Sequence, residues 1–388
     1  MASTGASRRI TLEELTVADV DSHVTYSFDD LLPYFDERQA GIRKLIEFAD
    51  HPASEIYSAF RATPAWFQTR RHDASREYDT AVDGEVDSRI HKHYLEQTTP
   101  EQKLAMMDDY GIDYTILGTG PSRLATVNHD PTAVAIASAY NSYVIDTFTD
   151  VDERLLATIT VAPQKPDAAA EEIDRVGDES GIVGVQLPAI GLIPPAGHPW
   201  YDPIYEAAQD HDLAILMHSG NAATWPVFPA QRYWAETFVE DHAFTFVAEP
   251  FWHIISMIFR GVPERFPELD FVFQEAGAEW LGWMMGRLDE HYLMSSQDVP
   301  MLSKPPSEYI VDQFYFGTQP VGERKNRQHT AMLLELAGGA DTVMFSTDHP
   351  HPDFDPPKDL FDTLRTHVGE EDLRGIMGET ALDVFGIS

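Results

Sequence analysis

The chain contains no cysteine, only seven lysines and no long apolar run, and each of these shortages excludes a class of structure. Without cysteine there are no disulfides and no thiolate ligands, so any metal must be held by histidine and carboxylate side chains. No stretch approaches the roughly 18 apolar residues of a membrane span. The first residues, MASTGASRRITLEELT, lack the apolar core of a signal peptide. The sequence therefore predicts a cytoplasmic protein.

Basic residues are outnumbered by acidic ones, 27 Lys and Arg against 64 Asp and Glu, which gives a formal net charge of -37. A surface of this sign repels phosphate backbones and anionic membranes, so we expect neither as a partner and expect a small-molecule substrate instead. We interpret the acidity as adaptation to a halophilic, high-salt cytoplasm, where the Debye length falls to about 3 Å at 1 M salt. The alternative is an acidic protein of an ordinary cytoplasm.

Short apolar runs alternate with longer amphipathic stretches along the 388 residues, which is typical of βαβ units. The predicted strands are 16–21, 114–119, 155–161, 182–188, 213–219, 269–275, 314–318 and 342–348. The predicted helices are 131–149, 167–180, 203–211, 245–260, 279–295, 325–338 and 357–386, with Asp167 and Asp202 as N-caps. Eight strands separated by helices predict an α/β fold, a (β/α)8 TIM barrel over residues 17–388 after an extension at 1–16.

Two segments are too long for ordinary loops of such a barrel. An insertion at about 40–100 follows the first strand, and residues 220–244 follow the fifth strand and are rich in aromatic side chains. Both are predicted to lie at the C-terminal mouth, the first as a lid. Near the second, Trp225, Arg232 and His253 are candidate substrate contacts, offering an apolar wall, a carboxylate partner and a hydrogen bond. The alternative is that the aromatic residues only pack this loop onto the barrel.

Potential metal ligands end several of the predicted strands. Asp21 and His23 end the first strand, where side chains two residues apart point the same way, and His218, Glu275 and Asp348 end the fifth, sixth and eighth. Taken singly, each has an ordinary explanation as a core, capping or turn residue. Because the strand ends of a barrel share one rim, together they predict a divalent metal site with about three or four protein ligands.

The motif Asp19-x-Asp21-x-His23 resembles the Asp-x-His-x-His opening of the amidohydrolase superfamily, with an acid in place of the first metal-binding histidine. The blocks LAILMHSG, FSTDHPHPDFD and IMGETALDVFGI are similar to the amidohydrolase-related family that includes aminocarboxymuconate-semialdehyde decarboxylase. This resemblance runs from about residue 17 to the C-terminus. It implies metal ligands at Asp21, His23, His218 and Asp348, Asp348 as general base, and a homo-oligomer that is a dimer or larger.

Glu275 departs from that resemblance, which implies a histidine in this block for the decarboxylases. An ionised glutamate cannot donate a hydrogen bond to a developing oxyanion. We therefore expect a hydrolase first, in which metal-activated water attacks a small carboxylated or aromatic substrate, with Asp348 as base and Glu275 orienting the water or acting as a second base or ligand. The alternatives are nonoxidative decarboxylation of an aromatic or unsaturated acid, and a catalytically silent binding barrel.

One divalent metal is expected, Zn²⁺ first and Mn²⁺ as the alternative, because two carboxylates and two imidazoles are somewhat harder ligands than zinc usually has. No nucleotide cofactor is expected. The stretch ILGTGPSR lacks the third glycine of a dinucleotide-binding fingerprint.

The acidic composition predicts that salt stabilises the protein. The melting temperature should rise as KCl increases from dilute buffer to multimolar concentration, because screening relieves the repulsion among acidic side chains. Thermal unfolding followed by circular dichroism across the KCl series measures this. Full stability in dilute buffer would contradict salt adaptation.

Overall fold

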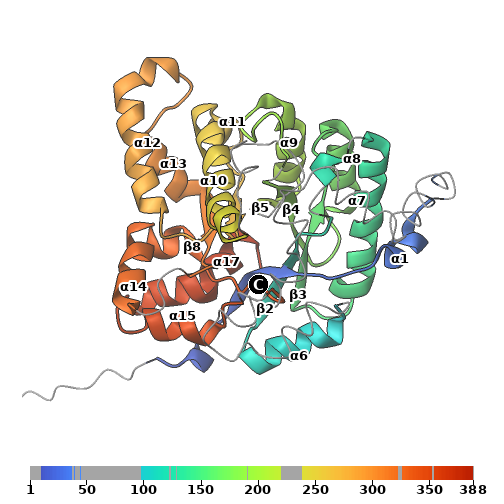
Figure 1. Ribbon diagram of the computed structural model, residues 1–388, viewed down its shortest axis with the longest axis horizontal. Helices are drawn as coiled ribbons and strands as arrows, with labels where there is room; N and C mark the ends of the chain where they lie inside the picture. Colours follow the sequence, from blue (N-terminus) through green and yellow to red (C-terminus); the bar gives the residue numbers. More distant parts are fainter. Residues whose placement is uncertain are drawn as a thin grey trace, which may run out of the picture.

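Eight parallel strands, hydrogen-bonded in the order β1 to β8, form the centre of the molecule, and helices surround them (Figure 1). The computed structural model describes residues 10–36, 39, 44, 98–121, 124–127, 129–189, 191–219, 238–321, 326–351 and 354–387. The strands are β1 (Ala18–His23), β2 (Tyr114–Gly118), β3 (Leu155–Thr160), β4 (Ile182–Pro188), β5 (Ala214–His218), β6 (Phe271–Gln274), β7 (Phe314–Gly317) and β8 (Val343–Met344). The predicted (β/α)8 barrel is confirmed.

The helices follow the strands along the chain and pack outside them. The α-helices are α1 (Phe28–Leu31), α6 (Pro100–Tyr110), α7 (Asp130–Val144), α8 (Pro166–Val176), α9 (Asp202–Asp210), α10 (Phe238–Phe259), α11 (Val262–Arg265), α12 (Leu281–Ser295), α13 (Pro306–Gln313), α14 (Arg327–Leu336), α15 (Pro357–Leu364), α16 (Glu370–Arg374) and α17 (Thr380–Val384). Two π-helical turns extend this set, η5 (Ile145–Thr149) and η10 (Gly375–Glu379). The 3₁₀ turns are η1 (Leu12–Glu14), η2 (Leu32–Tyr34), η4 (Leu124–Thr126), η6 (Pro199–Tyr201), η8 (Ser296–Asp298) and η9 (Gly339–Asp341).

The barrel closes between β1 and the segment that follows the two-residue strand β8. Val20 N donates to Phe345 O (3.1 Å), Asp348 N to Asp21 O (2.9 Å) and His23 N to His349 O (2.7 Å). Ser22 and His349 also form an isolated parallel bridge. Main-chain hydrogen bonding therefore continues past β8 and joins the two ends of the chain around the barrel.

Apolar side chains fill both sides of the barrel wall. One cluster lies inside the barrel and includes Val20, Ile116, Leu216, Val272 and Met344. The larger cluster packs the outer faces of the strands against the helices. The two clusters take alternate residues of most strands, as the pleat requires. Burial on both faces explains why the strands appear in the sequence as continuous apolar runs.

The register of β1 against β2 shifts between Asp19 and Ser22. Because of this shift, the consecutive residues Val20 and Asp21 both face the barrel interior: Val20 joins the interior cluster and Asp21 lies beside His218. Asp19 instead bonds Thr115 of β2 and Thr347. An irregularity of this kind re-aims a side chain at the end of a strand, here towards the mouth of the barrel.

All eight predicted strands are present, whereas the helix predictions need correction. Helices α6 and α13 were not predicted. Asp167 and Asp202 lie inside the first turns of α8 and α9, whose N-caps are Lys165 and Tyr201. The long C-terminal helix predicted over 357–386 is divided into α15, α16, η10 and α17. Nearly all of the predicted lid, about 40–100, lies outside the described residues. Among those that are described, no helix is long and apolar enough to cross a membrane.

Helical glycines provide a test of this packing. A Cβ on Gly378 would lie 2.4 Å from Thr16 O, so Gly378→Ala should force η10 away from the start of β1 and destabilise the protein by about 1–3 kcal/mol. Gly286 in α12 has no atom within 4 Å of an added Cβ, so Gly286→Ala should stabilise by about 0.5–1 kcal/mol. Denaturant unfolding measures both, and equal effects would contradict the close approach at Gly378.

Candidate metal centre

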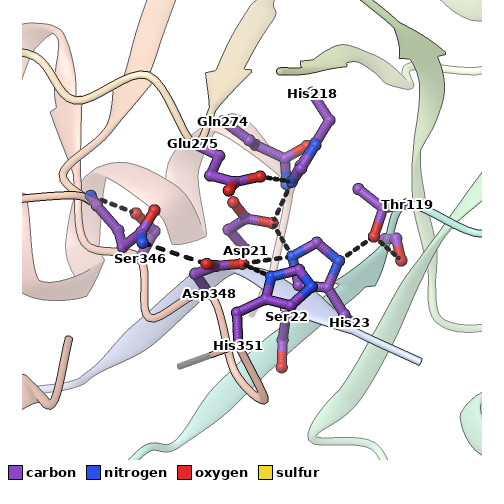
Figure 2. Close-up of polar contacts among 12 residues, drawn as sticks. Asp21, Ser22, His23, Thr119, His218, Gln274, Glu275, Ser346, Asp348 and His351 are labelled. Atoms are coloured by element: carbon purple, nitrogen blue, oxygen red, sulfur yellow. Dashed lines mark hydrogen bonds and ion pairs between the residues drawn. The ribbon is translucent and has the colours of Figure 1, made fainter. Parts of the chain in front are cut away.

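Four side chains, from the ends of β1 and β5 and from the segment after β8, converge at the C-terminal mouth of the barrel (Figure 2). Asp21 and His23 come from the end of β1, His218 ends β5 and Asp348 follows β8. One possible ligand atom from each lies within 4.8 Å of the others. The structure thus brings together all four residues predicted as metal ligands.

The close contacts within this group are those between the imidazole nitrogens of the two histidines and the carboxylate oxygens of the two aspartates. His23 Nε2 lies 2.6 Å from Asp348 Oδ1 and 3.7 Å from Asp21 Oδ1. His218 Nε2 lies 3.5 Å from the same Asp21 oxygen. Imidazole nitrogens and carboxylate oxygens face one common point, as ligands of a single cation do.

Glu275 and His351 lie directly beside these four residues. Glu275 Oε2 is 3.2 Å from His218 Nε2, and His351 Nδ1 is 2.5 Å from Asp348 Oδ1. His23, Glu275, Asp348 and His351 form a second group whose donor atoms lie within 4.8 Å of one another. Because His23 Nε2 has a single lone pair, it can ligate only one ion at a time. The two overlapping groups therefore describe one centre.

The backbone around this centre has an unusual conformation. Thr119, Glu275 and Asp348 each follow a strand, and their φ angles are 58°, 54° and 61°. Left-handed φ angles are uncommon in residues other than glycine and cost of order 1 kcal/mol or more each. Here they turn three side chains at the barrel rim, and such strain is concentrated in functional sites.

Burial sets the electrostatics of the cluster. Asp21 and Asp348 are 0% exposed, and His23, His218 and Glu275 are at most 7% exposed. Burial lowers the pKa of His23 to about 4, because a buried imidazolium loses its hydration. Burial also opposes the charge on Asp348, but the nearby His351 and the hydrogen bonds from His23 and His351 hold the pKa of that carboxyl below its usual range. Asp348 is therefore ionised at neutral pH.

Hydrogen bonds from polar side chains next to the centre hold in place the strands that bear the proposed ligands. Asp19 accepts hydrogen bonds from Thr347 N (2.8 Å) and Thr347 Oγ1 (2.7 Å), which ties β1 to the segment after β8. Gln274 Nε2 donates to Val20 O (2.6 Å) across the barrel interior. Thr119 bonds the Nδ1 of His23, which leaves Nε2 directed at the cluster.

Of the three residues predicted to contact substrate, His253 is the one in the described part of the chain, and it does not join this cluster. Trp225 and Arg232 lie outside the described residues. His253 lies in α10, where its Nε2 bonds Ala189 O (2.8 Å) and its Nδ1 accepts from Ala196 N (3.1 Å). With both ring nitrogens bonded to the main chain, His253 holds the segment after β4 and has no nitrogen left for a substrate.

The geometry defines a (β/α)8 barrel with a cluster of imidazoles and carboxylates at its catalytic face. Residues 86–387 match the amidohydrolase family. The chain belongs to this family, as the sequence resemblance predicted. β1, with Asp21 and His23, precedes the matched segment, so their assignment rests on their position in the cluster.

Individual relatives agree with this assignment. The chain is 23% identical to the gamma-resorcylate decarboxylase of Polaromonas sp. over 74% of its length and 87% of the relative's. It is 23% identical to the 2-amino-3-carboxymuconate-6-semialdehyde decarboxylase of Dictyostelium discoideum over 81% and 84%. The fold is similar to that of 5-carboxyvanillate decarboxylase from Novosphingobium aromaticivorans, solved with manganese and 4-hydroxy-3-methoxy-5-nitrobenzoic acid, with a TM-score of 0.69, 17% identity and 98% coverage of each chain.

The sequence analysis did not assign a place to Lys103, a buried residue of α6 near the centre. Signals for α6 were present, since Thr99 and Gln102 form a capping box, Pro100 begins the helix and Gly111 ends it. Within α6, Lys103 shares the buried face with Met106 and Met107, at the i+3 and i+4 spacing. This spacing could have placed Lys103 against the barrel.

His253 gives a pH-dependent prediction. Burial lowers its pKa to about 4 from an ordinary value of 6.5, so between these pH values the unfolded chain binds more protons than the folded protein. The stability that neutral His253 contributes is therefore lost as pH falls from 6.5 to 4. Between pH 7 and 4.5, His253→Gln should lose about 2 kcal/mol less stability than the wild type. Denaturant unfolding at both pH values measures this, and identical losses would contradict it.

Proposed function

We propose that this protein is a metal-dependent, nonoxidative decarboxylase of an aromatic or unsaturated carboxylic acid. The observation that carries the proposal is the match to two kinds of decarboxylase over about three quarters of the chain or more, combined with a buried cluster of imidazoles and carboxylates at the barrel mouth. Glu275 favoured hydrolysis ahead of decarboxylation when the sequence was considered alone, and the similarity to decarboxylases reverses that order.

The donor set fits one divalent cation. Both carboxylate oxygens of Asp21 and the Nε2 of His218 are buried and have no hydrogen-bond partner among the described residues, which is costly unless another ligand satisfies them. Asp21, His23, His218 and Asp348 would hold the ion. Mn²⁺ suits this set because its carboxylates are hard ligands, and manganese is bound in the similar Novosphingobium enzyme. Zn²⁺, expected first from the sequence, remains the alternative.

When bound, the cation supplies positive charge that orients and polarises an acid substrate. Asp348 is the residue we assign to proton transfer. Because Asp348 is ionised in the resting protein, it first takes up a proton from the acid substrate or from solvent, and it then delivers this proton to the ring or vinyl carbon as the bond to the carboxyl group breaks and CO₂ leaves. Its carboxyl is held by Gln319, His23 and His351, so its position relative to the substrate is fixed. Burial of the cluster excludes water from the reacting carbon.

Hydrolysis is the second candidate, and Glu275 is the observation that favours it. Glu275 is nearly buried, and its Oε2 lies 3.2 Å from His218 Nε2 at the edge of the cluster. A carboxylate in this place can accept a proton from water, whereas it cannot donate a hydrogen bond when ionised. In this alternative Asp348 is the general base and Glu275 orients the attacking water.

The products of the reaction distinguish the two candidates. The Mn²⁺-loaded protein should release CO₂ from hydroxybenzoates, and Asp348→Asn should lower that rate by at least about 100-fold because the proton donor is lost. Chelation should abolish the activity and added Mn²⁺ should restore it. Mass spectrometry of the products, together with elemental analysis of the wild type and Asp348→Asn, measures these outcomes.

The reaction products and the metal content of the protein show which of the two proposed reactions is wrong. Release of an acid from an ester, lactone, amide or β-diketone without CO₂ from any hydroxybenzoate would favour hydrolysis, and Glu275→Gln should then reduce that rate. A wild-type protein that binds no divalent ion would contradict both reactions and leave a silent binding barrel.

A further inference from the structure

Lys103 is a fully buried lysine behind the candidate centre, on the outer side of the barrel wall. It lies in α6 and is 0% exposed. An isolated ammonium group is costly to bury, so a lysine in this position requires compensating partners. Burial lowers the pKa of Lys103 to about 7, while the negative charges of Asp19, Asp348 and Asp21 favour its protonated form.

The side-chain nitrogen of Lys103 joins the two segments that carry the proposed ligands. Nζ donates to Ser22 Oγ (2.7 Å) in β1 and to His349 O (3.3 Å) after β8, and it pairs with His349 Nδ1 (2.8 Å). These three acceptors match the three donors of an ammonium group. Ser22 lies between Asp21 and His23, and His349 directly follows Asp348.

A second contact from the same helix supports the junction. The ring of Tyr110 at the end of α6 packs on Phe354 (4.9 Å between centroids), and Phe354 packs edge-on against His349 (5.9 Å). Helix α6 therefore touches the segment after β8 through a hydrogen-bonded lysine and an aromatic contact. Ser22 and His349 are at most 1% exposed, so substrate cannot reach Lys103 and the residue has no direct part in the reaction.

We propose that Lys103 is a positioning residue of the metal centre: it fastens β1 to the segment after β8 and so holds Asp21, His23 and Asp348 at the spacing that one divalent cation requires. This inference rests on the metal centre of the proposed function. Main-chain hydrogen bonds, Asp19 and the weaker Ser22 Oγ to His349 O bond (3.4 Å) also join these two segments, and Lys103 adds a contact to both of them from a helix outside the barrel.

The direction in which the cation affinity changes when Lys103 is replaced distinguishes a positioning role from a purely electrostatic one. Removing a positive charge near a cation site would by itself strengthen cation binding, because the repulsion between lysine and cation is lost. Removing a positioning contact weakens cation binding, because the ligands lose their common geometry. Partners behind a metal site typically change metal affinity by about 10–100-fold.

The test is a titration of the full-length, metal-depleted protein with Mn²⁺, in which free ion is followed by electron paramagnetic resonance. Lys103→Met should raise the Kd for Mn²⁺ by about tenfold or more. Ser22→Ala keeps the lysine but removes one of its acceptors together with the Ser22 Oγ to His349 O bond (3.4 Å), and it should also raise the Kd. Lys165→Met removes an equal charge from an exposed lysine paired with Asp130 and should leave the Kd unchanged.

The outcomes are distinguishable. If the wild type binds no Mn²⁺, the proposed metal centre itself is wrong. If the wild type binds Mn²⁺ and Lys103→Met binds it equally or more tightly, only the role of Lys103 is overturned. If Lys103→Met does not fold, Ser22→Ala decides, and an unchanged Kd in that variant overturns the proposal. Where both variants fold, the double variant should show less than the sum of the two effects, because the residues act through one contact.

Discussion

The site depends on the main-chain hydrogen bonds between β1 and the segment after β8, among them Asp348 N to Asp21 O (2.9 Å), because they close the barrel and set the distance between its two ends. β8 has only two residues, so the junction with β1 is made mainly by the irregular segment that follows it. That segment carries Asp348, and β1 carries Asp21 and His23. The same contacts therefore close the barrel and bring the proposed ligands together.

Burial of like charges is the second constraint. Asp19, Asp21 and Asp348 are each 0% exposed, and Glu275 is close to them, so the cluster gathers carboxyl groups whose ionisation burial opposes; burial raises the pKa of Asp19 to about 7. Thr347 and Thr115 satisfy Asp19, and the nearby Lys103 supplies positive charge. Asp21 lies near the two imidazoles, but neither of its carboxylate oxygens has a hydrogen-bond partner among the described residues. A bound cation is the compensation that this arrangement calls for, and it explains why backbone strain is retained at Glu275 and Asp348.

The reaction class depends on a small difference at the rim of the barrel. The fold and the proposed ligands are compatible with either water or an acid substrate at the ion, and family membership alone does not choose between them. Glu275 places a carboxylate where a hydrogen-bond donor would help an oxyanion, while Asp348 is held ionised beside two histidines. Proton transfer by Asp348 belongs to both reactions. Trp225 and Arg232 remain predictions as substrate contacts.

Several features were predictable because they are local. The apolar runs marked all eight strands, and residues at their ends share one rim in any barrel, which was enough to group Asp21, His23, His218, Glu275 and Asp348. The choice of four of these as metal ligands came from the family resemblance. Helix α6 had clear end signals but was not predicted, and with it the position of Lys103 was not recognised. His253 appeared suited to a substrate, and only its contacts with Ala189 and Ala196 revealed a structural role.

The sequence by itself determined the barrel, the acidic character of the protein and the set of side chains available to a metal, because hydrophobic periodicity and residue type are properties of the chain alone. The tertiary structure decided which of those side chains turn inward. The register shift in β1 separates Asp19 from Asp21, although both belong to one motif. Such a shift depends on hydrogen bonds with β2 and the segment after β8, which are far away in the chain and meet β1 only when the barrel closes.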